Sequence, residues 1–546
     1  MPSQSKILVI SLTRMGDIIQ SIPFFRRLRL KHPDAEIHML VESCFTDVAA
    51  LVPGVDAVHA VKLEDLLPCL GAGKALDLAR AVSFYRTFVD KLRNQNFTEV
   101  WNLTHTRPSM VLCNLLAGEQ GRGVTLDREG LQRVNSPWLR YFFATNLARP
   151  WCQFNLVDIY ANCVDGVEWT AGRDLQVDLP AASCSGTTTA AHWIAIHPGA
   201  SQQAKQWPVA QYREVARRLA KHSDVEFVLI GGRSDAPLAR EFEGIPRVRN
   251  LIGKTSVPQL ALLLSHCRLL LSNDSGPMHI AAAVGTRVID LTVGSALAGE
   301  TAPYGEGHLV VEPDSDCFPC SPHGACPSQP CAARISAETV AALTELELGM
   351  RSSLAPDDLG GCRVYRTRFS QADGLLELER LFSRTACVRD DVNAFARPAW
   401  LSALEGRGVG AAASRFVPTD LMAAAQRAQD AAMQIEDLAA QIARAATSAH
   451  ADIEAIQRWG AALTGQEELL RTALQSHGLL RSARAYTDIA RASLAGGTLA
   501  DQASETADIY HMLGALLRHI AGAAPTLEIN NSHITYSRED AHANLA

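Results

Sequence analysis

Two short polar segments, far apart in the chain, combine residue types that can bind and activate a ligand. The first is Thr13–Asp17, directly after the apolar run Ile7–Leu12, and the second is Ser272–His279, directly after another apolar run. In open α/β sheets, ligands bind at the carboxyl ends of strands, where the following helices offer free N–H groups. The two segments therefore predict a cleft between two α/β domains, in which one segment supplies a carboxylate and the other an anion pocket.

The two segments suggest different chemistry. Asp17 could take a proton from an attacking hydroxyl as general base, although an acidic residue in a first helical turn also suits the helix dipole alone. Ser275 and Gly276 would expose N–H groups at a helix N-terminus, which suits a diphosphate. Asp274 and His279 would position a ribose, a phosphate or the loop itself, and a simple helix N-cap is the alternative role for Asp274.

A third candidate segment is the loop His197–Pro208, which follows the apolar run Trp193–Ile196. The loop N–H groups and the Ser201 hydroxyl would donate hydrogen bonds to a phosphate, and Lys205 would add a positive charge. A plain connecting loop with an exposed lysine is the alternative. The three segments together indicate a phosphate-bearing ligand more strongly than any one of them alone.

Strands and helices alternate around these segments, which argues for parallel sheets. We expect a first α/β domain over residues 1–175 and a second over residues 190–350, closed by a helix at Ser336–Leu348 with Ser336 as its N-cap. From residue 351 to residue 546 alanine becomes frequent and strand signals thin out. This last part is predicted to be a separate helical domain.

Composition narrows the class of protein. The 546 residues are 47% hydrophobic and 20% charged, with a net charge of −7, which argues against a general nucleic-acid binder. No apolar stretch is long enough to span a bilayer, and the N-terminus has no signal-peptide form, so we expect a cytoplasmic protein. The basic residues of the helix at 21–31 favour either a solvated face or contact with an anionic acceptor or membrane surface.

Four of the thirteen cysteines fall in one short window, at Cys317, Cys320, Cys326 and Cys331. Four thiolates at this spacing can hold a structural zinc or iron ion, and free thiols in a loop are the alternative. Disulfides are not expected in a reducing cytosol. Nothing in the pattern suggests a catalytic metal.

The motifs resemble those of glycosyltransferase family 9, the bacterial heptosyltransferases of lipopolysaccharide core assembly. The resemblance covers roughly residues 5–348, and the motifs are jointly specific for the family but much less specific for the sugar. The matching segments are Arg14–Asp17 with Ile22-Pro23, His197–Gly199 with Lys205–Pro208, Gly253–Ser256, Asn273–His279, and Tyr304-Gly305 followed by the cysteine window.

The resemblance implies a GT-B fold, with two facing Rossmann-like domains, here followed by the α-helical C-terminal domain. It implies metal-independent, inverting transfer of a hexosyl or heptosyl group from a nucleotide sugar, typically ADP-heptose, with no catalytic cofactor. Asp17 matches the catalytic base. Lys205 would contact the donor phosphates and stabilise the charge that grows on the leaving group.

The remaining site residues also follow from the resemblance. Asn102 is a departure, because the family segment at this place often begins with Asp. On the donor side the matching positions are Ser201, Asp235 near the ribose, Asp274, Ser275, Gly276 and His279, and on the acceptor side they are Arg14 and His105.

The acceptor stays open at this point. A lipopolysaccharide-core glycolipid, another surface glycan and a protein hydroxyl are all alternatives, and the enzyme would work in the cytoplasm or at the inner face of the inner membrane. A scaffold or assembly subunit with an inactive transferase part is the second hypothesis, in which the helical extension mediates homo-oligomerisation. A sugar epimerase with the same two-domain cleft is a more distant alternative.

Overall fold

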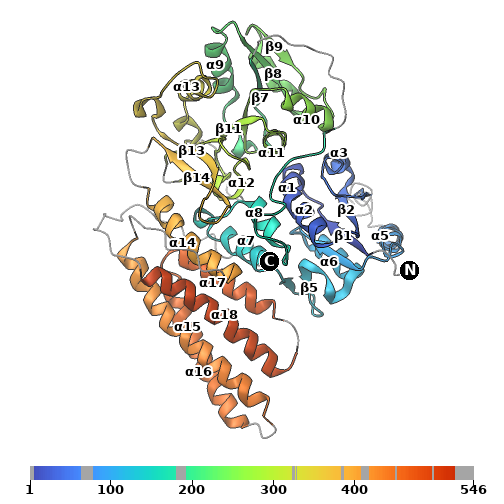
Figure 1. The fold of residues 1–546 in the computed structure, drawn as a ribbon, viewed down its shortest axis with the longest axis vertical. Helices are drawn as coiled ribbons and strands as arrows, with labels where there is room; N and C mark the ends of the chain where they lie inside the picture. Colours follow the sequence, from blue (N-terminus) through green and yellow to red (C-terminus); the bar gives the residue numbers. More distant parts are fainter. Residues whose placement is uncertain are drawn as a thin grey trace. The chain divides into compact units, whose positions relative to one another are not determined.

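In the computed structural model the chain forms two compact units (Figure 1). The first unit is Met1–Arg122 with Asn155–Arg384, and the second is Gly123–Phe154 with Thr385–Ala546. The structure describes residues 5–62, 78–179, 192–315, 317–321, 326, 329–382, 387–406, 417–448, 452–494 and 497–522.

The first unit begins with a parallel sheet in the strand order β3-β2-β1-β4. The buried runs of aliphatic residues predict these strands, and Leu8, Ile10 and Leu40 form the centre of their core. The strands are β1 (Lys6–Ile10), β2 (Glu36–Glu42), β3 (Ala57–Val61) and β4 (Glu99–Asn102), and the helices are α1 (Met15–Gln20), α2 (Ile22–Lys31), α3 (Thr46–Ala49), α5 (Leu78–Arg93) and α6 (Arg107–Ala117).

A second sheet in the same unit has the order β14-β13-β12-β11-β10-β7-β8-β9. Its strands from β7 to β12 are parallel, and β13 and β14 join antiparallel to β12 and to each other. The strands are β7 (His192–His197), β8 (Val225–Leu229), β9 (Val248–Asn250), β10 (Leu269–Asn273), β11 (Arg287–Leu291), β12 (Leu309–Pro313), β13 (Cys362–Phe369) and β14 (Leu376–Leu381).

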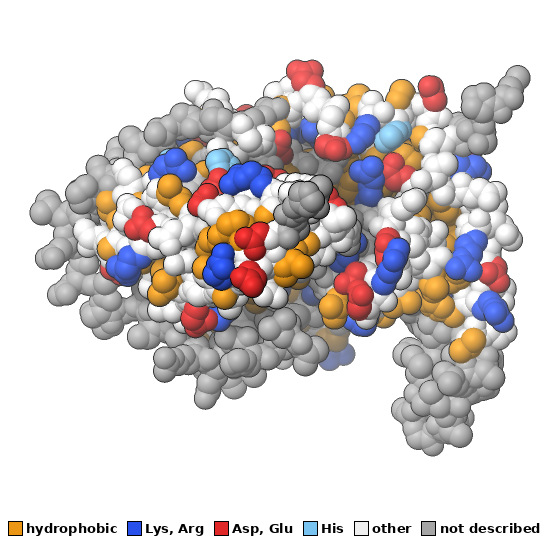
Figure 2. Space-filling model, turned by 90° about the horizontal axis from the view of Figure 1, so that it is seen from below, with side chains coloured by type: hydrophobic (Ala, Val, Ile, Leu, Met, Phe, Trp, Pro, Cys, Tyr) orange, Lys and Arg blue, Asp and Glu red, His pale blue; other side chains and the backbone are white. Residues whose placement is uncertain are grey.

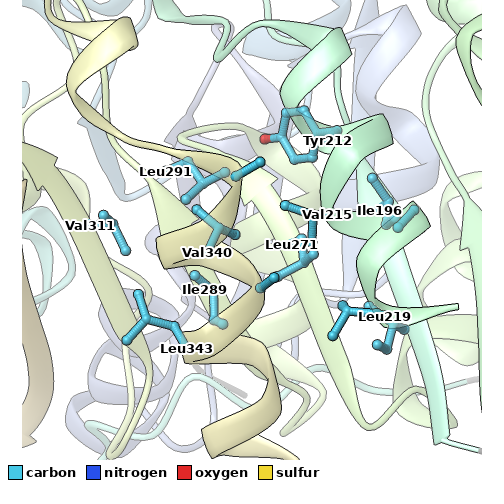
Figure 3. Packing of buried hydrophobic residues seen from close by; sticks show 14 of the residues in the cluster. Ile196, Tyr212, Val215, Leu219, Leu271, Ile289, Leu291, Val311, Val340 and Leu343 are labelled. Carbon is cyan, nitrogen blue, oxygen red and sulfur yellow. The ribbon is translucent and has the colours of Figure 1, made fainter. Parts of the chain in front are cut away.

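Two helices cover one face of this second sheet, α9 (Val209–Leu219) and α13 (Ala337–Glu347). Figure 3 shows their apolar side chains meeting those of the strands. Ser336 caps α13, as expected, because its hydroxyl accepts a hydrogen bond from Thr339 N–H at 3.0 Å. The unit also contains α8 (Leu156–Asn162), α10 (Val257–Ser265), α11 (Gly276–Ala283) and α12 (Ala298–Thr301).

The second unit is mainly helical, as predicted for the C-terminal part of the chain. Its long helices carry stripes of alanine that let α15 pack against α16 and α18, and Trp400 and Tyr141 form an aromatic contact. The helices are α7 (Pro137–Asn146), α14 (Val388–Glu405), α15 (Thr419–Ala446), α16 (Ile453–Leu474), α17 (Gly478–Ala492) and α18 (Leu499–Ala521). On the face shown in Figure 2, basic and acidic side chains are interspersed among the coloured residues.

The boundaries of the units differ from the expected ones in two places. The segment after residue 350 does not turn helical at once, because β13 and β14 continue the second sheet to Leu381. Residues 123–154, expected in the first α/β domain, belong to the helical unit, where β6 (Gln132–Val134) pairs antiparallel with β5 (Arg122–Leu126) and α7 packs on α17. Neither the β13–β14 extension of the sheet nor the position of residues 123–154 could be predicted from local sequence, because each depends on contacts between segments far apart in the chain.

The basic residues of helix α2 all have partners within their own unit. The guanidinium of Arg27 is buried and donates hydrogen bonds to the carbonyls of Glu168 and Ala171 at 3.0 Å each. Arg26 pairs with Asp174, and Arg29 and Lys31 also have acidic partners within the unit. These contacts hold α2 against neighbouring segments of its own unit. Separately, none of the described helices is long and apolar enough to cross a membrane.

Candidate functional site

Both polar segments lie where the strand order of a sheet reverses. In the first sheet the chain builds outward from β1 on one side and from β4 on the other, and in the second it does so from β7 and from β10. Such switch points leave a crevice at the carboxyl ends of the two central strands, where α/β proteins bind ligands. The segment Thr13–Asp17 follows β1. Strand β7 ends at His197 and strand β10 ends at Asn273, and the other two polar segments continue from these residues.

Helices α1 and α11 bring these segments together from the two sheets. A Cβ atom added to Gly16 would lie 2.9 Å from Cδ2 of His279, and one added to Gly276 would lie 2.4 Å from Cε of Met15. The glycines thus allow the two helix N-termini to approach more closely than side chains would permit. The sequence prediction that the two motifs share one site agrees with this contact.

Asp17 lies in the first turn of α1, as its motif predicts. Its carboxylate accepts a hydrogen bond from the Thr13 hydroxyl at 3.1 Å. Burial raises the pKa of Asp17 above its ordinary value, and the neighbouring Arg14 and the Thr13 hydroxyl counteract this only in part. The charges of Asp274 and Lys205, from the segments of the second sheet, also act on the pKa of Asp17, Asp274 raising it and Lys205 lowering it.

Lys205 and Asp274 form the central ion pair of the second sheet's site. The Lys205 ammonium lies 3.0 Å from the Asp274 carboxylate, and their side chains are 16% and 6% exposed. His279 Nε2 lies 4.0 Å from the other carboxylate oxygen. Burial raises the pKa of Asp274, but Lys205, His279 and the Thr301 hydroxyl together lower it below the ordinary value. Burial also lowers the pKa of His279 to about 4, so this ring is neutral at pH 7.

Ser275 and Gly276 open helix α11 as expected, with Ser275 as the N-cap in an extended conformation and Pro277 in the first turn. Pro277 has no N–H, and the N–H groups of Met278 and His279 donate to the Ser275 carbonyl, so the N–H groups of Ser275 and Gly276 are the ones at this helix start that would bind an anion. Ser201 is exposed in the loop between β7 and α9. The described residues thus provide a charged ammonium, hydroxyls and a helix N-terminus around one crevice.

Asp235 fills a structural position that the sequence did not predict. Its carboxylate accepts a hydrogen bond from Gly232 N–H at 2.8 Å and lies 3.8 Å from Nε2 of His197. A Cβ atom on Gly199 would come within 2.5 Å of this carboxylate, so Asp235 closes the space between two loops. The interaction with His197 lowers the pKa of Asp235. A role in ribose binding stays a prediction.

The loop after β4 carries His105, one of the two residues predicted to contact the acceptor. The Asn102 side chain accepts a hydrogen bond from Thr104 N–H at 3.0 Å, and the Thr104 hydroxyl accepts one from Leu12 N–H at 2.8 Å. Asn102, which departs from the family pattern, therefore shapes the loop beside the Asp17 motif. His105 is half-buried there, and the burial of its ring, together with the charge of Arg14, lowers its pKa to about 4.

Two polar residues of the site were not singled out as site residues from the sequence, Asn273 and His197. Asn273 donates hydrogen bonds to the carbonyls of Pro198 and Gly199, and it accepts one from Trp207 N–H at 2.8 Å. It thereby ties the phosphate loop of β7 to the end of β10. His197 lies beside Ser272 in the register of these neighbouring strands. Only the strand order, which the sequence does not reveal, brings these residues together.

The cysteine window gives a mixed result. Burial and then the neighbouring thiols of Cys331, Cys326 and Cys317 raise the pKa of Cys320 to about 11, so the four groups lie near one another. Four thiols suit zinc or iron once a cation favours their ionised forms. Among the residues that the structure describes, however, no three His, Cys, Asp or Glu side chains are grouped as a metal site. A structural metal stays a prediction.

Comparisons with known proteins agree with the two-sheet architecture and the motifs. Residues 86–327 match the family model described as glycosyltransferase family 9 (heptosyltransferase). Lipopolysaccharide heptosyltransferase 3 of Escherichia coli K12 is 25% identical over 292 residues, which covers 50% of this chain and 79% of that protein. Lipopolysaccharide heptosyltransferase 2 of Salmonella typhimurium is 25% identical over 327 residues, which covers 55% of this chain and 84% of that protein.

A solved structure supports the fold. The family 9 glycosyltransferase from Veillonella parvula has a TM-score of 0.51 at 20% sequence identity, and the match covers 64% of this chain and 99% of that chain. At this identity the likeness concerns the fold alone.

The α/β part of the chain has the GT-B fold and is that of a glycosyltransferase. In sequence this part is similar to glycosyltransferase family 9, which confirms the resemblance predicted from the motifs. The helical region comes in addition to this part.

Proposed function

We propose that this protein transfers heptose from ADP-heptose to a hydroxyl group of a lipopolysaccharide-core or other surface-glycan acceptor, with inversion at the anomeric carbon and without a catalytic metal. The observation that carries the proposal is the contact of helix α1, which carries Asp17, with helix α11, which follows Asp274 of the Lys205–Asp274 pair. A base and an anion-binding pole across one crevice are the parts that a single displacement needs. The names of the relatives, which act in lipopolysaccharide assembly, support the sugar and the acceptor class.

In the donor site, the diphosphate would lie against Lys205, the Ser201 and Ser275 hydroxyls, and the N-terminus of α11. Each of these groups can donate a hydrogen bond or carries positive charge. Asp274 would hold Lys205 in place, because the two side chains are already 3.0 Å apart. Asp235 and His279 would line the nucleotide end of the site.

The reaction would be one inverting displacement. The acceptor hydroxyl gives its proton to Asp17 and its oxygen attacks the anomeric carbon, while the bond from that carbon to the diphosphate oxygen breaks and ADP leaves. The raised pKa of Asp17 suits this role, since it makes the carboxylate a stronger base than an exposed aspartate. Lys205 and the α11 N-terminus would stabilise the charge that develops on ADP.

The test has two parts. Calorimetry with ADP, and with UDP and GDP as controls, should give selective ADP binding that Lys205→Ala weakens and that the exposed Lys221→Ala does not. Asp17→Asn should bind ADP like the wild type but transfer heptose at least 100-fold more slowly, a loss typical for removal of a general base. Asp47, exposed on α3, provides the matched control as Asp47→Asn.

Each outcome has a distinct meaning. Preference for UDP or GDP would keep the transferase and replace the sugar donor, whereas normal turnover in Asp17→Asn would refute the assigned base. No binding of any nucleotide would favour the alternative, a transferase-like scaffold with the helical unit mediating oligomerisation. Light scattering on the full chain measures that oligomerisation. Truncation at residue 350 would be a poor test because it removes β13 and β14 from the second sheet.

The cellular setting is part of the same proposal. We expect the enzyme to act in the cytoplasm at the inner face of the inner membrane, where a lipid-linked acceptor would be presented. A protein hydroxyl as acceptor is the alternative, and mass spectrometry of the products with each acceptor class would separate the two. Elemental analysis of the purified protein would test the structural zinc or iron at the cysteine window.

A further inference from the structure

Lys205 lies in a short turn at the tip of the loop between β7 and α9. Residues Gln203–Lys205 form a single 3-10 turn, in which Lys205 N–H donates a hydrogen bond to the carbonyl of Gln202 at 3.0 Å. From this turn the Lys205 ammonium reaches the Asp274 carboxylate, 3.0 Å away. The position of the positive charge in the proposed donor site therefore depends on the contacts that hold the turn.

The base of the loop is held by Asn273, the last residue of β10. Its side chain donates hydrogen bonds to the carbonyls of Pro198 and Gly199, where the loop begins. It also accepts a hydrogen bond from the N–H of the fully buried Trp207, where the loop ends. Because these bonds fix only the two ends, the tip needs support from other segments.

The loop after β11 supports the tip at Gly294. The φ angle of Gly294 is +64°, and a Cβ atom added to it would lie 1.9 Å from the Ala204 carbonyl oxygen. Atoms that are not bonded do not approach so closely, so a side chain at this position would displace the turn that carries Lys205. The Gly294 loop is itself held, because its carbonyl accepts a hydrogen bond from Cys320 N–H at 2.8 Å.

The segment between Cys326 and Cys331 supports the same turn at a second point. The side-chain amide of Gln329 donates a hydrogen bond to the carbonyl of Gln203 at 3.1 Å. Gln203 is the first residue of the turn and is followed by Ala204, the residue that Gly294 contacts. The cysteine window thus reaches the tip in two ways, through Cys320 N–H behind Gly294 and through Gln329.

We propose that Gly294 and Gln329 are positioning residues of the donor site, which hold the turn so that Lys205 meets the diphosphate of the nucleotide sugar. The inference rests on the proposed function. It gives the cysteine window a part in donor binding that depends on a main-chain N–H and an amide side chain rather than on the thiols. Both residues act through Lys205, and they make or break no bond of the substrate.

A small displacement of the turn is enough to matter. The Lys205 side chain is 16% exposed and is already paired with Asp274, so it has little freedom to compensate for a shift of its main chain. A misplacement of about 1 Å can cost about 100-fold in rate when a group must meet a reacting substrate. The loss of one hydrogen bond at a partly exposed amide has a smaller effect, about threefold.

The experiment measures ADP affinity by calorimetry on the full chain. We expect Gly294→Ala to bind ADP about tenfold more weakly, since the turn is displaced. Gln329→Met keeps the length of the side chain but removes the amide, and should bind ADP about threefold more weakly. The matched controls are Gly349→Ala and Gln120→Met, which should bind like the wild type: Gly349 also has a positive φ, +74°, but an added Cβ atom meets nothing within 4 Å, and Gln120 is exposed.

A double-mutant cycle separates positioning of Lys205 from a general structural role. In a Lys205→Met background, neither Gly294→Ala nor Gln329→Met should weaken ADP binding further, because the group that they position is gone. A loss as large in this background as in the wild type would overturn the inference, because it would show that the two residues act elsewhere.

The remaining outcomes are also distinct. ADP binding equal to that of the wild type in Gln329→Met and in folded Gly294→Ala would overturn the inference and leave the proposed function standing. If Gly294→Ala does not fold, Gln329→Met decides alone, because it removes only the amide. Absence of ADP binding in the wild type would instead contradict the proposed function.

Discussion

Removal of the Lys205 charge should cost the folded protein stability as well as donor affinity. In Lys205→Met the aliphatic stem is kept, but Asp274, which is 6% exposed, loses the ammonium 3.0 Å away. Breaking a buried ion pair by removing one partner costs about 3–5 kcal/mol. Because the Lys205 side chain is 16% exposed, we expect a loss near the lower end, about 3 kcal/mol.

The pH dependence of this loss has a definite sign. The pKa of Asp274 is lowered in the folded protein below its ordinary value of 3.8, and Lys205 contributes most among the groups that lower it. A lowered carboxyl pKa contributes stability that is present above the unfolded value and disappears as the pH falls through the folded value. The penalty of Lys205→Met should therefore be complete at pH 7, begin to shrink as the pH falls through the pKa of Asp274 in the variant, which rises when Lys205 is removed, and disappear below the lowered pKa of the wild type.

Thermal and urea unfolding followed by circular dichroism would measure the loss. For a unit of this size, about 3 kcal/mol corresponds to a fall in Tm of about 4 °C. In a double-mutant cycle, Lys205→Met/Asp274→Asn should recover about 2 kcal/mol relative to the sum of the single variants, since no unpaired charge is left buried. Additive losses, or a loss in Lys205→Met no larger than in Lys221→Met, would refute the reasoning.

Three other predictions concern neighbouring features. Asp290→Asn should raise stability at pH 8 by about 1–2 kcal/mol, because burial and Asp274 raise the pKa of Asp290 and stability falls as the pH rises towards that value; unfolding of the wild type and of the variant at pH 5 and pH 8 measures this gain in stability, and a gain that is the same at both pH values would contradict the prediction. Arg27→Met should cost about 3 kcal/mol, since several main-chain carbonyls lose their donor; a loss below that of the exposed Arg93→Met would argue against this role. Gly16→Ala should lower kcat/KM about 10-fold to 100-fold, because its Cβ would press on His279, and unchanged kinetics would show that the helices adapt.

The sequence predicted the local elements and the class of the site well. Apolar runs followed by Gly, Ser, Asp or Pro marked strand ends, and the N-cap of α13 at Ser336 could be foreseen from its position before an amphipathic run. The motif residues Asp17, Lys205 and Asp274 were recognised by type and spacing, and they lie at the carboxyl ends of strands as expected. Such signals are local, because they depend on a few neighbouring residues.

Contacts between distant segments were not foreseen. The basic residues of α2 suggested a solvated face or contact with an anionic surface. In the structure they form hydrogen bonds to main-chain carbonyls of residues 164–171 and ion pairs with nearby carboxylates. The hairpin of β13 and β14 was assigned to the helical part because alternation in a two-stranded segment is weak evidence until its partner β12 is known. Residues 123–154 were placed with their sequence neighbours rather than with the helices they pack against.

The sequence by itself thus determined which residues carry the chemistry and which kind of strand end presents them. Only the tertiary structure decided how they are combined, because strand order and the packing of α1 on α11 bring the Asp17 motif against the helix that follows Asp274. It also decided that the His197 ring lies between the Ser275 hydroxyl and the Asp235 carboxylate. Proton positions and charge balance act over a few ångströms in space, whereas the sequence records only separation along the chain.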